Sequence, residues 1–301
     1  MKSYTTLLAR AKKWVQKSDS TTESDLAEYI NDGHKHVCGL RDWDWLKDSF
    51  TTLTVASQEA YNYPAYSDKP NSVTVTVSTT KHSPTEIHSQ DEWDRITSAT
   101  TGNASDTPIH WFATNGQIKL FPIPATSSNT ITINAKVTIK DLSIADYSTG
   151  SVQAVTNGST TVTGTGTSWA TSMAGRWIRI TESDTANKGD GQWYKIASVA
   201  STTSLTLTRA YAGTSISAGT AAYVIGQMPL IPENYQLIPA YWAAAEYWRH
   251  NDTDRATTYA NQYTDLLGQL ISAHSSKTSS PVIFRSKRTP ILNPNLFPIV
   301  T

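Results

Sequence analysis

Closely spaced carboxylates are the residues of this sequence most able to do chemistry. One set is Asp42 and Asp44, and the other is Asp91, Glu92 and Asp94. Two carboxylates can act as general acid and general base when burial raises the pKa of one of them. Nothing around either set predicts burial, and an arginine adjoins each set in the sequence. We therefore expect both sets to lie on the surface, exposed or ion-paired.

Two further patterns could hold a metal ion or a phosphate group. His34 and His36 are two residues apart, and on a helix this spacing turns them to different faces, so they cannot easily share one ion. The Gly-Thr-Gly segment 164–166 lacks the lysine and the hydroxyl residue that end a phosphate-binding loop. We expect a turn at 164–166, a structural or surface role for the histidines, and neither a metal nor a cofactor.

Nucleophilic catalysis has no support in the sequence. No serine stands in the Gly-x-Ser-x-Gly pattern of a nucleophile elbow. Cys38 is the only cysteine, so an intrachain disulfide is excluded. Trp43 and Trp45 could stack bases or sugars, but two tryptophans this close more often complete the core between a helix and a sheet. We expect that structural role, and we expect the protein not to be an enzyme.

The bulk composition excludes several classes of protein. The chain has 301 residues with 25 basic and 25 acidic side chains, so its formal net charge gives no global field to hold nucleic acid. Ten Trp and 14 Tyr supply enough burial to argue against disorder over most of the length. No apolar run approaches the length of a membrane span, and the first residues lack the apolar region of a signal peptide.

Helical spacing of apolar residues marks both ends of the chain. It predicts helices over about 3–16, from 20 to about 38, and in a pair that begins at Pro232 and ends near residue 274. Ser20 and Glu23 fit a capping box at the start of the second helix. Each pair has one apolar stripe, so we expect the two pairs to form one bundle. The residues expected to be largely buried there are Trp14, Leu26, Ile30, Trp242 and Leu266.

Between these ends the sequence is rich in Ser and Thr and has the alternation of β-strands. Apolar runs on either side of Asn115-Gly116 predict a hairpin. Several short strands between 150 and 226 predict a small β-barrel or sandwich, inserted into a connection. The expected fold class is α+β. The expected division is a helical-bundle domain with a β section (1–149 and 227–275), an inserted all-β domain (150–226) and an extended C-terminal arm (276–301).

The predicted arm combines prolines with apolar residues and a basic cluster. Four prolines between 281 and 301 exclude a regular helix. The apolar side chains need burial that the arm cannot supply to itself, which suits a segment that orders on a partner. The residues expected to contact that partner are Phe284, Arg285, Arg288, Ile291, Leu292 and Phe297.

An ordered series of short motifs resembles a known family. The series consists of Ile-Asn-Asp-Gly (30–33), Arg-Asp-Trp-Asp-Trp-Leu (41–46), Tyr-Asn-Tyr-Pro (61–64), Ile-Lys-Leu-Phe-Pro-Ile-Pro (118–124), Leu-Ile-Pro-Glu-Asn-Tyr (230–235) and Ala-Ala-Ala-Glu-Tyr (243–247). It is similar to the head-to-tail adaptor (connector, head-completion) proteins of tailed bacteriophages, over about 1–145 and 227–275. The motif and core residues carried over are Asn31, Gly33, Trp43, Trp45, Pro232 and Tyr235.

The resemblance implies a virion protein in the neck, made in the cytoplasm of the bacterial host. Such proteins form rings, usually of twelve copies, between the portal and the tail. The implied partners are copies of the chain itself, the portal protein, and tail or nozzle proteins. DNA would pass through the lumen without sequence-specific binding, and no membrane is involved.

Two other functions stay open at the level of sequence. Four aromatic residues of the predicted inserted domain, Trp169, Trp177, Trp193 and Tyr194, could make it a carbohydrate-binding or adhesion module on a helical stalk. The carboxylates Asp91 and Asp94 could belong to a wall-degrading enzyme. Binding of glycans by 150–226 would favour the first alternative, and peptidoglycan cleavage that depends on these carboxylates would favour the second.

Overall fold

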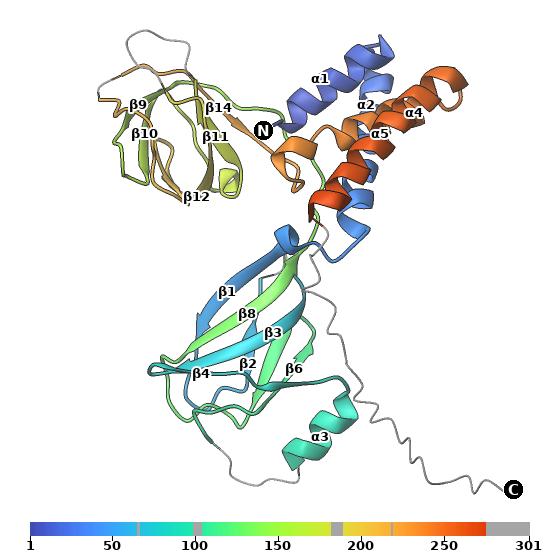
Figure 1. Ribbon diagram of the computed structural model, residues 1–301. Coiled ribbons are helices and arrows are strands. Elements are labelled where there is room, and N and C mark those ends of the chain that lie inside the picture. The colour runs from blue at the N-terminus through green and yellow to red at the C-terminus, as the bar shows by residue number, and fades with distance from the viewer. Residues whose placement is uncertain (65–66, 99–103, 182–188, 218, 275–301) are drawn as a thin grey trace, which may run out of the picture.

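A computed structural model describes residues 1–64, 67–98, 104–181, 189–217 and 219–274. Helices and strands are mixed, which confirms the α+β prediction. We call the parts the helical unit, the first β unit (47–137) and the second β unit (147–226). In Figure 1 the helical unit and the second β unit lie side by side above the first β unit. The predicted arm, 276–301, lies outside the described residues.

The helical unit is assembled from the two ends of the described chain. It contains α1 (Tyr4–Val15), α2 (Ser20–Gly39), α4 (Ile238–Trp248) and α5 (Thr253–His274), with 3-10 turns η1 (Asp44–Leu46) and η3 (Glu233–Tyr235). Helix α4 packs against each of the other helices, so it is the centre of the unit. The ridges of small residues on α4 allow this, because Ala240, Ala243 and Ala244 are fully buried.

Burial in the helical unit follows the predicted stripes only in part. Leu26 and Ile30 are fully buried, as expected. Trp14, Trp242 and Leu266 are half-buried and pack against the cores of the helical unit, so the expectation for these three is confirmed only in part. For Trp14 and Leu266 the position explains the difference, because α1 and α5 each pack on α4 from the outside.

The predicted cap of α2 and the predicted start of α4 are wrong, whereas α2 begins at Ser20 as predicted. Asp19, not Ser20, caps α2, because its carboxylate accepts hydrogen bonds from the Thr22 backbone N–H (2.9 Å) and hydroxyl (2.7 Å). Glu23 instead pairs with Lys12 of α1 at 2.5 Å. At the other end, Pro232 precedes η3, and α4 begins only at Ile238, where Pro239 occupies the first turn.

The first β unit consists of two sheets packed face to face. One has the order β1 (Lys47–Leu53), β8 (Thr130–Val137), β3 (Ser67–Val77), β4 (Thr80–His82), and the other β2 (Ala60–Asn62), β7 (Gln117–Phe121), β6 (His110–Thr114), β5 (Thr85–Ile87). Only β5 and β6 pair in parallel among the described strands. The core between the sheets contains Val73, Val75, Trp111, Ile118, Leu120, Ile131 and Ile133.

Local sequence signals in this unit succeed at the hairpin and fail at a helix. Asn115 and Gly116 have φ angles of 48° and 76°, the positive values that a two-residue hairpin turn requires. Helix α3 (Gln90–Ser98) was not predicted. It buries Trp93 against Phe112 and Phe121, with ring centroids 5.7 Å and 6.3 Å apart.

The second β unit is a curled six-stranded sheet. Its order is β14 (Tyr223–Gly226), β11 (Trp177–Ile180), β12 (Trp193–Ser201), β13 (Ser204–Leu207), β10 (Thr161–Thr165), β9 (Ser151–Val155), with the 3-10 turn η2 (Thr171–Met173). Isolated bridges from β9 to Ala221 and Ile216 bring its edge back toward β14. Strands β9 and β10 were not predicted, and the expected turn at 164–166 is in part the bulged end of β10.

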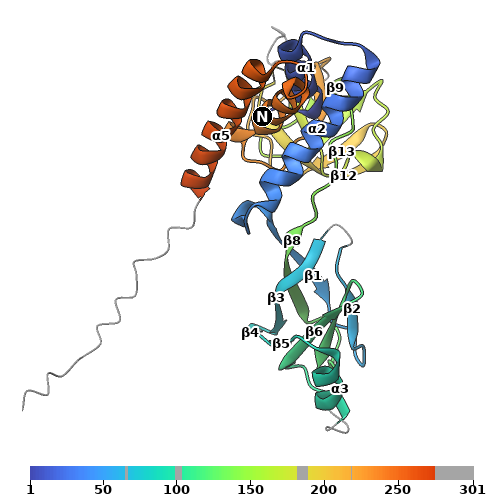
Figure 2. The same ribbon diagram turned by 90° about the vertical axis from the view of Figure 1, so that its right-hand side faces the viewer.

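The two ends of the second β unit lie next to each other. Tyr147 and Ile225 exchange backbone hydrogen bonds of 2.9 Å and 2.7 Å. The chain therefore enters and leaves this unit at one point. In Figure 2 the first β unit likewise hangs below the helical unit, joined to it through the segments before β1 and after β8.

Candidate functional site

Asn31 joins α2 to the segment that leads into the second β unit. Its amide accepts a hydrogen bond from the Leu142 N–H (2.7 Å) and donates one to the Leu142 carbonyl (3.1 Å). A side-chain amide is suited to this task because it carries both a donor and an acceptor. Leu142 itself is buried in the core of the helical unit.

Gly33 is the point of closest approach between α2 and α4. A Cβ atom at this position would lie 2.8 Å from Cβ and 2.9 Å from Cγ of Trp242. These atoms are next to the α4 backbone and cannot move aside cheaply. Glycine is therefore required here for packing between helices.

Trp43 and Trp45 lie on the underside of the helical unit, where the chain turns toward β1. Trp43 is buried, its Nε1–H donates to the Val37 carbonyl (2.8 Å), and its ring stacks on Trp45 with centroids 5.4 Å apart. Both rings belong to the core that also contains Ile238 and Leu270. In this position Trp43 packs within the protein and offers no face to a base or a sugar.

Pro232 and Tyr235 lie at η3, beside the C-terminal end of α5. The half-buried Tyr235 ring is 6.1 Å from the His274 ring. The chain beyond His274 leaves the described part of the structure from this corner. The predicted partner-binding residues Phe284, Arg285, Arg288, Ile291, Leu292 and Phe297 lie outside the described residues.

The carboxylate sets do not form a catalytic site. Asp42 and Asp44 are exposed, and each lies 3.0 Å from Lys47. Asp91 and Asp94 are exposed on α3. Neither set has the burial that a general acid needs. Within the described residues, no group of His, Cys, Asp and Glu could hold a metal ion.

The two histidines have separate structural partners. His36 Nδ1 lies 2.7 Å from the Tyr263 hydroxyl, and its ring stacks on Trp242. His34 is buried, and its Nε2 accepts a hydrogen bond from the Leu230 N–H at 3.1 Å. Burial lowers the pKa of His34 to about 4, because the charged ring would lose its hydration. His34 is therefore neutral at pH 7.

Most aromatic residues of the second β unit face its own core. Trp169 and Tyr194 are each 2 % exposed, and the Trp169 Nε1–H donates to the Tyr223 hydroxyl. Trp193 is 9 % exposed and lies under the guanidinium of Arg179, 5.0 Å from the ring centroid. A glycan-binding platform needs exposed ring faces, and of the four aromatic residues considered only Trp177 is half-exposed.

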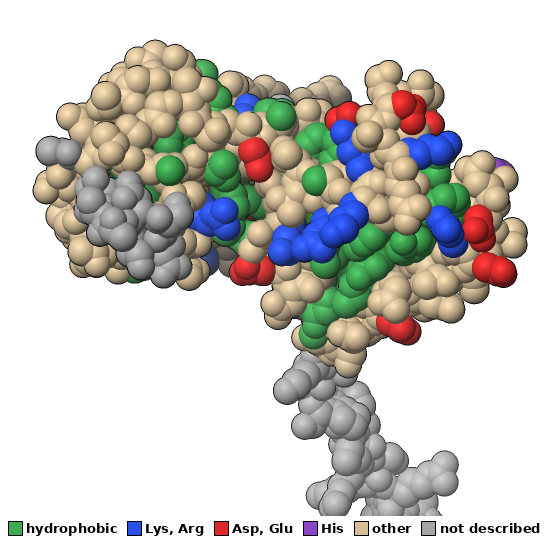
Figure 3. All heavy atoms as spheres, turned by 90° about the horizontal axis from the view of Figure 1, so that it is seen from above, with side chains coloured by type: hydrophobic (Ala, Val, Ile, Leu, Met, Phe, Trp, Pro, Cys, Tyr) green, Lys and Arg blue, Asp and Glu red, His purple; other side chains and the backbone are tan. Residues whose placement is uncertain are grey.

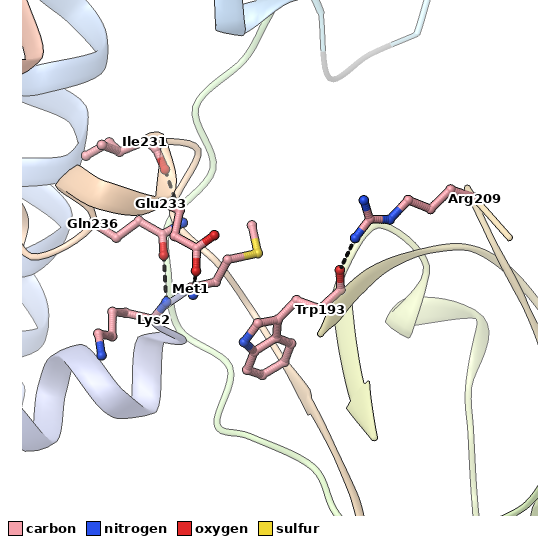
Figure 4. Close-up of polar contacts among 7 residues, drawn as sticks. All are labelled: Met1, Lys2, Trp193, Arg209, Ile231, Glu233 and Gln236. Atoms are coloured by element: carbon pink, nitrogen blue, oxygen red, sulfur yellow. Dashed lines mark hydrogen bonds and ion pairs between the residues drawn. The ribbon is translucent and has the colours of Figure 1, made fainter. Parts of the chain in front are cut away.

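A cleft of about 320 Å³ separates the second β unit from the start of α1. Figure 4 shows Trp193 and Arg209 on one side of it, and Met1 and Glu233 on the other. The N-terminal ammonium pairs with Glu233, and Arg209 donates to the Trp193 carbonyl (3.1 Å). Each wall thus has a polar contact of its own, and neither contact crosses the cleft.

Hydrogen bonds behind the cleft fix the start of α1 to both connections of the second β unit. The Ser3 hydroxyl donates to Asp146 (2.8 Å), and the Tyr4 N–H donates to the Gln227 carbonyl (2.8 Å). The Lys2 N–H donates to the side chain of buried Gln236 (2.6 Å). The cleft is therefore a joint between units.

The helical unit has a surface that we call the aromatic–basic face. Its aromatic part is a stack in which the ring centroid of half-buried Trp14 lies 4.5 Å from that of Tyr241 and 5.7 Å from that of Tyr259. Its basic part is Arg10, Lys13 and Lys17, all exposed. Seen from above, hydrophobic side chains form a stripe across this unit with Lys and Arg side chains beside it (Figure 3).

Our sequence reasoning assigned Trp14 to the core and overlooked this face. A signal was present, because Arg10 and Lys13 are three residues apart, which places them together on one face of α1. Lys17 follows just beyond the end of this helix. Aromatic side chains and Arg are enriched in protein interfaces, whereas Lys is depleted there. The half-buried Trp14, Tyr241 and Tyr259 and the exposed Arg10 therefore have the composition of a contact surface. We therefore treat the aromatic–basic face as a candidate contact surface.

A comparison with known protein families gives a match over the N-terminal half of the chain. The family described as "SU10 adaptor protein" matches residues 2–155, more than half of the 301-residue chain. The match spans α1, α2 and the first β unit and ends at the last residue of β9. No curated protein matches the chain. Within the described residues, no helix is both long and apolar enough to cross a bilayer.

Proposed function

The chain belongs to the SU10 adaptor protein family, a family of phage head–tail adaptors, and we propose that its copies form a ring that joins the portal to the tail. The ring would hold twelve copies and enclose a conduit through which DNA passes without sequence-specific contacts. It would lie in the neck of the virion, after synthesis in the host cytoplasm. Its role is mechanical, and no residue acts as a catalyst.

The observation that carries this proposal is the family match, together with the part of the structure that it covers. It covers both N-terminal helices and the first β unit, while the aromatic–basic face is left exposed on the helical unit. A subunit that keeps half-buried Trp14, Tyr241 and Tyr259 at its surface has hydrophobic area for a neighbour to cover. The balanced net charge also suits self-association, because copies repel each other little.

The division of the chain gives each part a proposed role. The helical-bundle domain with its β section (1–149 and 227–275) forms the ring. The arm (276–301) attaches to the portal through its apolar and arginine side chains, and it starts at the corner of α5 and Tyr235. Tail or nozzle proteins dock on the ring, and the inserted domain (150–226) projects from it.

The test measures assembly and attachment separately. The mass of the full-length protein is determined by native mass spectrometry, alone and with purified portal. We expect closed oligomers that bind the portal. A second sample truncated after residue 280 should keep its helical content and lose portal binding. A full-length protein that stays monomeric with and without portal would overturn the proposed ring, and normal portal binding by the truncated protein would overturn the role of the arm.

A further inference from the structure

We propose that the aromatic–basic face of one copy docks on the outer face of α2 in a second copy. This rests on the proposed function in so far as it supplies the contact between neighbours in the ring. Charge complementarity between the two surfaces favours a second copy of the chain as the partner. One edge of the helical unit carries Arg10 and Lys13, and the opposite edge carries acidic side chains of α2. Neither group has an ion-pair partner in the part of the chain that the structure describes.

The basic edge lies on α1, away from α2. Lys12, on the side facing α2, is neutralised by Glu23. Arg10 and Lys13 point elsewhere, are exposed, and have no carboxylate partner among the described residues. Lys17 extends the edge and lies over the Tyr247 ring, 5.8 Å from its centroid. The aromatic stack of Trp14, described above, borders this edge.

The acidic edge lies on α2. Asp25, Glu28 and Asp32 recur three and four residues apart, which places them on one face of the helix. Glu28 and Asp32 are exposed and Asp25 is half-buried. Within the described residues none of the three has an ion-pair partner. Burial raises the pKa of Tyr29, and the charges of Asp25, Glu246, Glu28 and Asp32 raise it further.

The two edges face away from each other within one copy. The Lys12–Glu23 pair marks the contact side of the α1–α2 hairpin, so the remaining charges of both helices lie on its outer sides. A copy therefore carries a positive edge and a negative edge that cannot satisfy each other internally. A contact between unlike edges of successive copies is heterologous, and such contacts close into a ring when the rotation between copies permits.

The aromatic and charged parts of the contact have different roles. Large rings such as Trp14 and Tyr259 supply most of the affinity when a partner covers them. Opposite charges at the rim set the register and speed the encounter, and they are weakened by salt. Reversing the charges should therefore prevent the contact, because like charges would face each other.

The experiment exchanges the charges of the two edges in the full-length protein. One variant carries Arg10→Glu and Lys13→Glu, a second carries Glu28→Lys and Asp32→Lys, and a third carries all four changes. Assembly is followed by sedimentation velocity over a concentration series. A control with Lys81→Glu and Lys195→Glu reverses two exposed charges on the β units. Circular dichroism checks that each variant is folded.

We expect the first two variants to need about tenfold more protein than the unaltered chain for assembly. The control should assemble normally. The fourfold variant, and an equimolar mixture of the first two, should recover assembly, because unlike edges meet again. Normal assembly of both reversed variants, or no recovery in the fourfold variant and the mixture, would overturn this contact while leaving a ring through another surface intact. An unaltered chain that never assembles would overturn both the contact and the proposed function.

Discussion

The second β unit and the helical unit are stabilised in opposite ways. The core of the second β unit is drawn entirely from residues between Tyr147 and Ile225. The core of the helical unit brings Leu7 and Leu26 together with Ala240 and Ala243, more than 200 residues later in the chain. One unit is thus complete within a single stretch of sequence, and the other exists only when both ends of the chain are present.

The same difference appears at the two surfaces. Inward-facing residues of the second β unit are covered by its own curled sheet, and three of its four candidate aromatic residues have little exposed area. The helical unit leaves Trp14 and Leu266 half-buried, because α1 and α5 each pack on α4 with one side only. A self-contained unit needs no partner for its stability, whereas the helical unit has surface to share.

Removal of each region in turn should give the largest effect. Replacing residues 147–226 with a short Gly/Ser linker should leave the helical unit folded, since the backbones of Tyr147 and Ile225 already pair and the linker has little distance to span. Ending the chain after residue 228 removes α4 and α5, which exposes Leu26 and Ile30 and should abolish cooperative folding of the helical unit. Far-UV circular dichroism with thermal melting measures both outcomes.

A linker variant that loses its helical signal would show that the second β unit is not separable. The hydrogen bonds from Ser3 to Asp146 and from Tyr4 to Gln227 involve only residues that the linker variant keeps. They should therefore still hold the start of α1 in place in that variant. Changing Ser3 to Ala in the linker variant should lower its stability only slightly, by about 1 kcal/mol.

Core truncations should separate the two regions by unfolding transition. Leu26 of the helical unit and Leu205 of the second β unit are both fully buried. Leu26→Ala and Leu205→Ala should each cost about 2–5 kcal/mol, from lost burial and the cavity left behind. Differential scanning calorimetry should show a shift in one transition for Leu26→Ala and in a different one for Leu205→Ala. A single transition that moves in both variants would mean that the regions unfold together.

The sequence predicts elements whose signals are local. The hairpin at Asn115-Gly116 follows from a turn that needs positive φ at both residues, and the helix ranges follow from apolar spacing. Helix α3 was missed because it is short and buries mainly Trp93, which gives no repeating stripe. Strand β10 was missed because its Gly and Thr residues near 164 resemble a turn.

Features that depend on distant contacts could not be read from the sequence. Asp19 and Ser20 are both good caps, and the choice of Asp19 depends on Lys12 of α1 drawing Glu23 away from a capping box. For Trp14, the apolar spacing gives a direction but not the amount of cover that α4 and α5 provide. Gly33 and Asn31 were recognised through their motif, whereas their physical roles required the positions of Trp242 and Leu142.

Acidification should affect the helical unit through His34. The folded-state pKa of His34 is about 4, below the usual value of 6.5, so the unfolded chain binds a proton more readily. The stability that depends on neutral His34 is complete above pH 6.5 and is lost as pH falls toward 4, by up to about 3 kcal/mol. Urea titrations of the unaltered protein and of His34→Asn at several pH values measure this loss.

Asparagine can still accept the Leu230 hydrogen bond but does not titrate, so the stability of His34→Asn should depend less on pH between 6.5 and 4. The matched control is His250→Asn, at an exposed position, which should keep the pH dependence of the unaltered protein. If the free energy of unfolding of all three proteins changed equally with pH, His34 could not be buried and neutral.

The smallest effect compares two glycines on opposite sides of α4. Gly33 of α2 has no room for a Cβ, which would lie 2.8 Å from Trp242 Cβ, whereas a Cβ at Gly268 of α5 would meet nothing within 4 Å. Gly33→Ala should destabilise the protein by about 1–3 kcal/mol through overpacking, in spite of the better helix propensity of alanine. Gly268→Ala should stabilise it by about 0.5–1 kcal/mol. Chemical denaturation measures both. If Gly33→Ala were as stabilising as Gly268→Ala, α2 could not be in close contact with α4. The side of the helical unit that carries the acidic edge would then be more loosely packed than the side formed by α5.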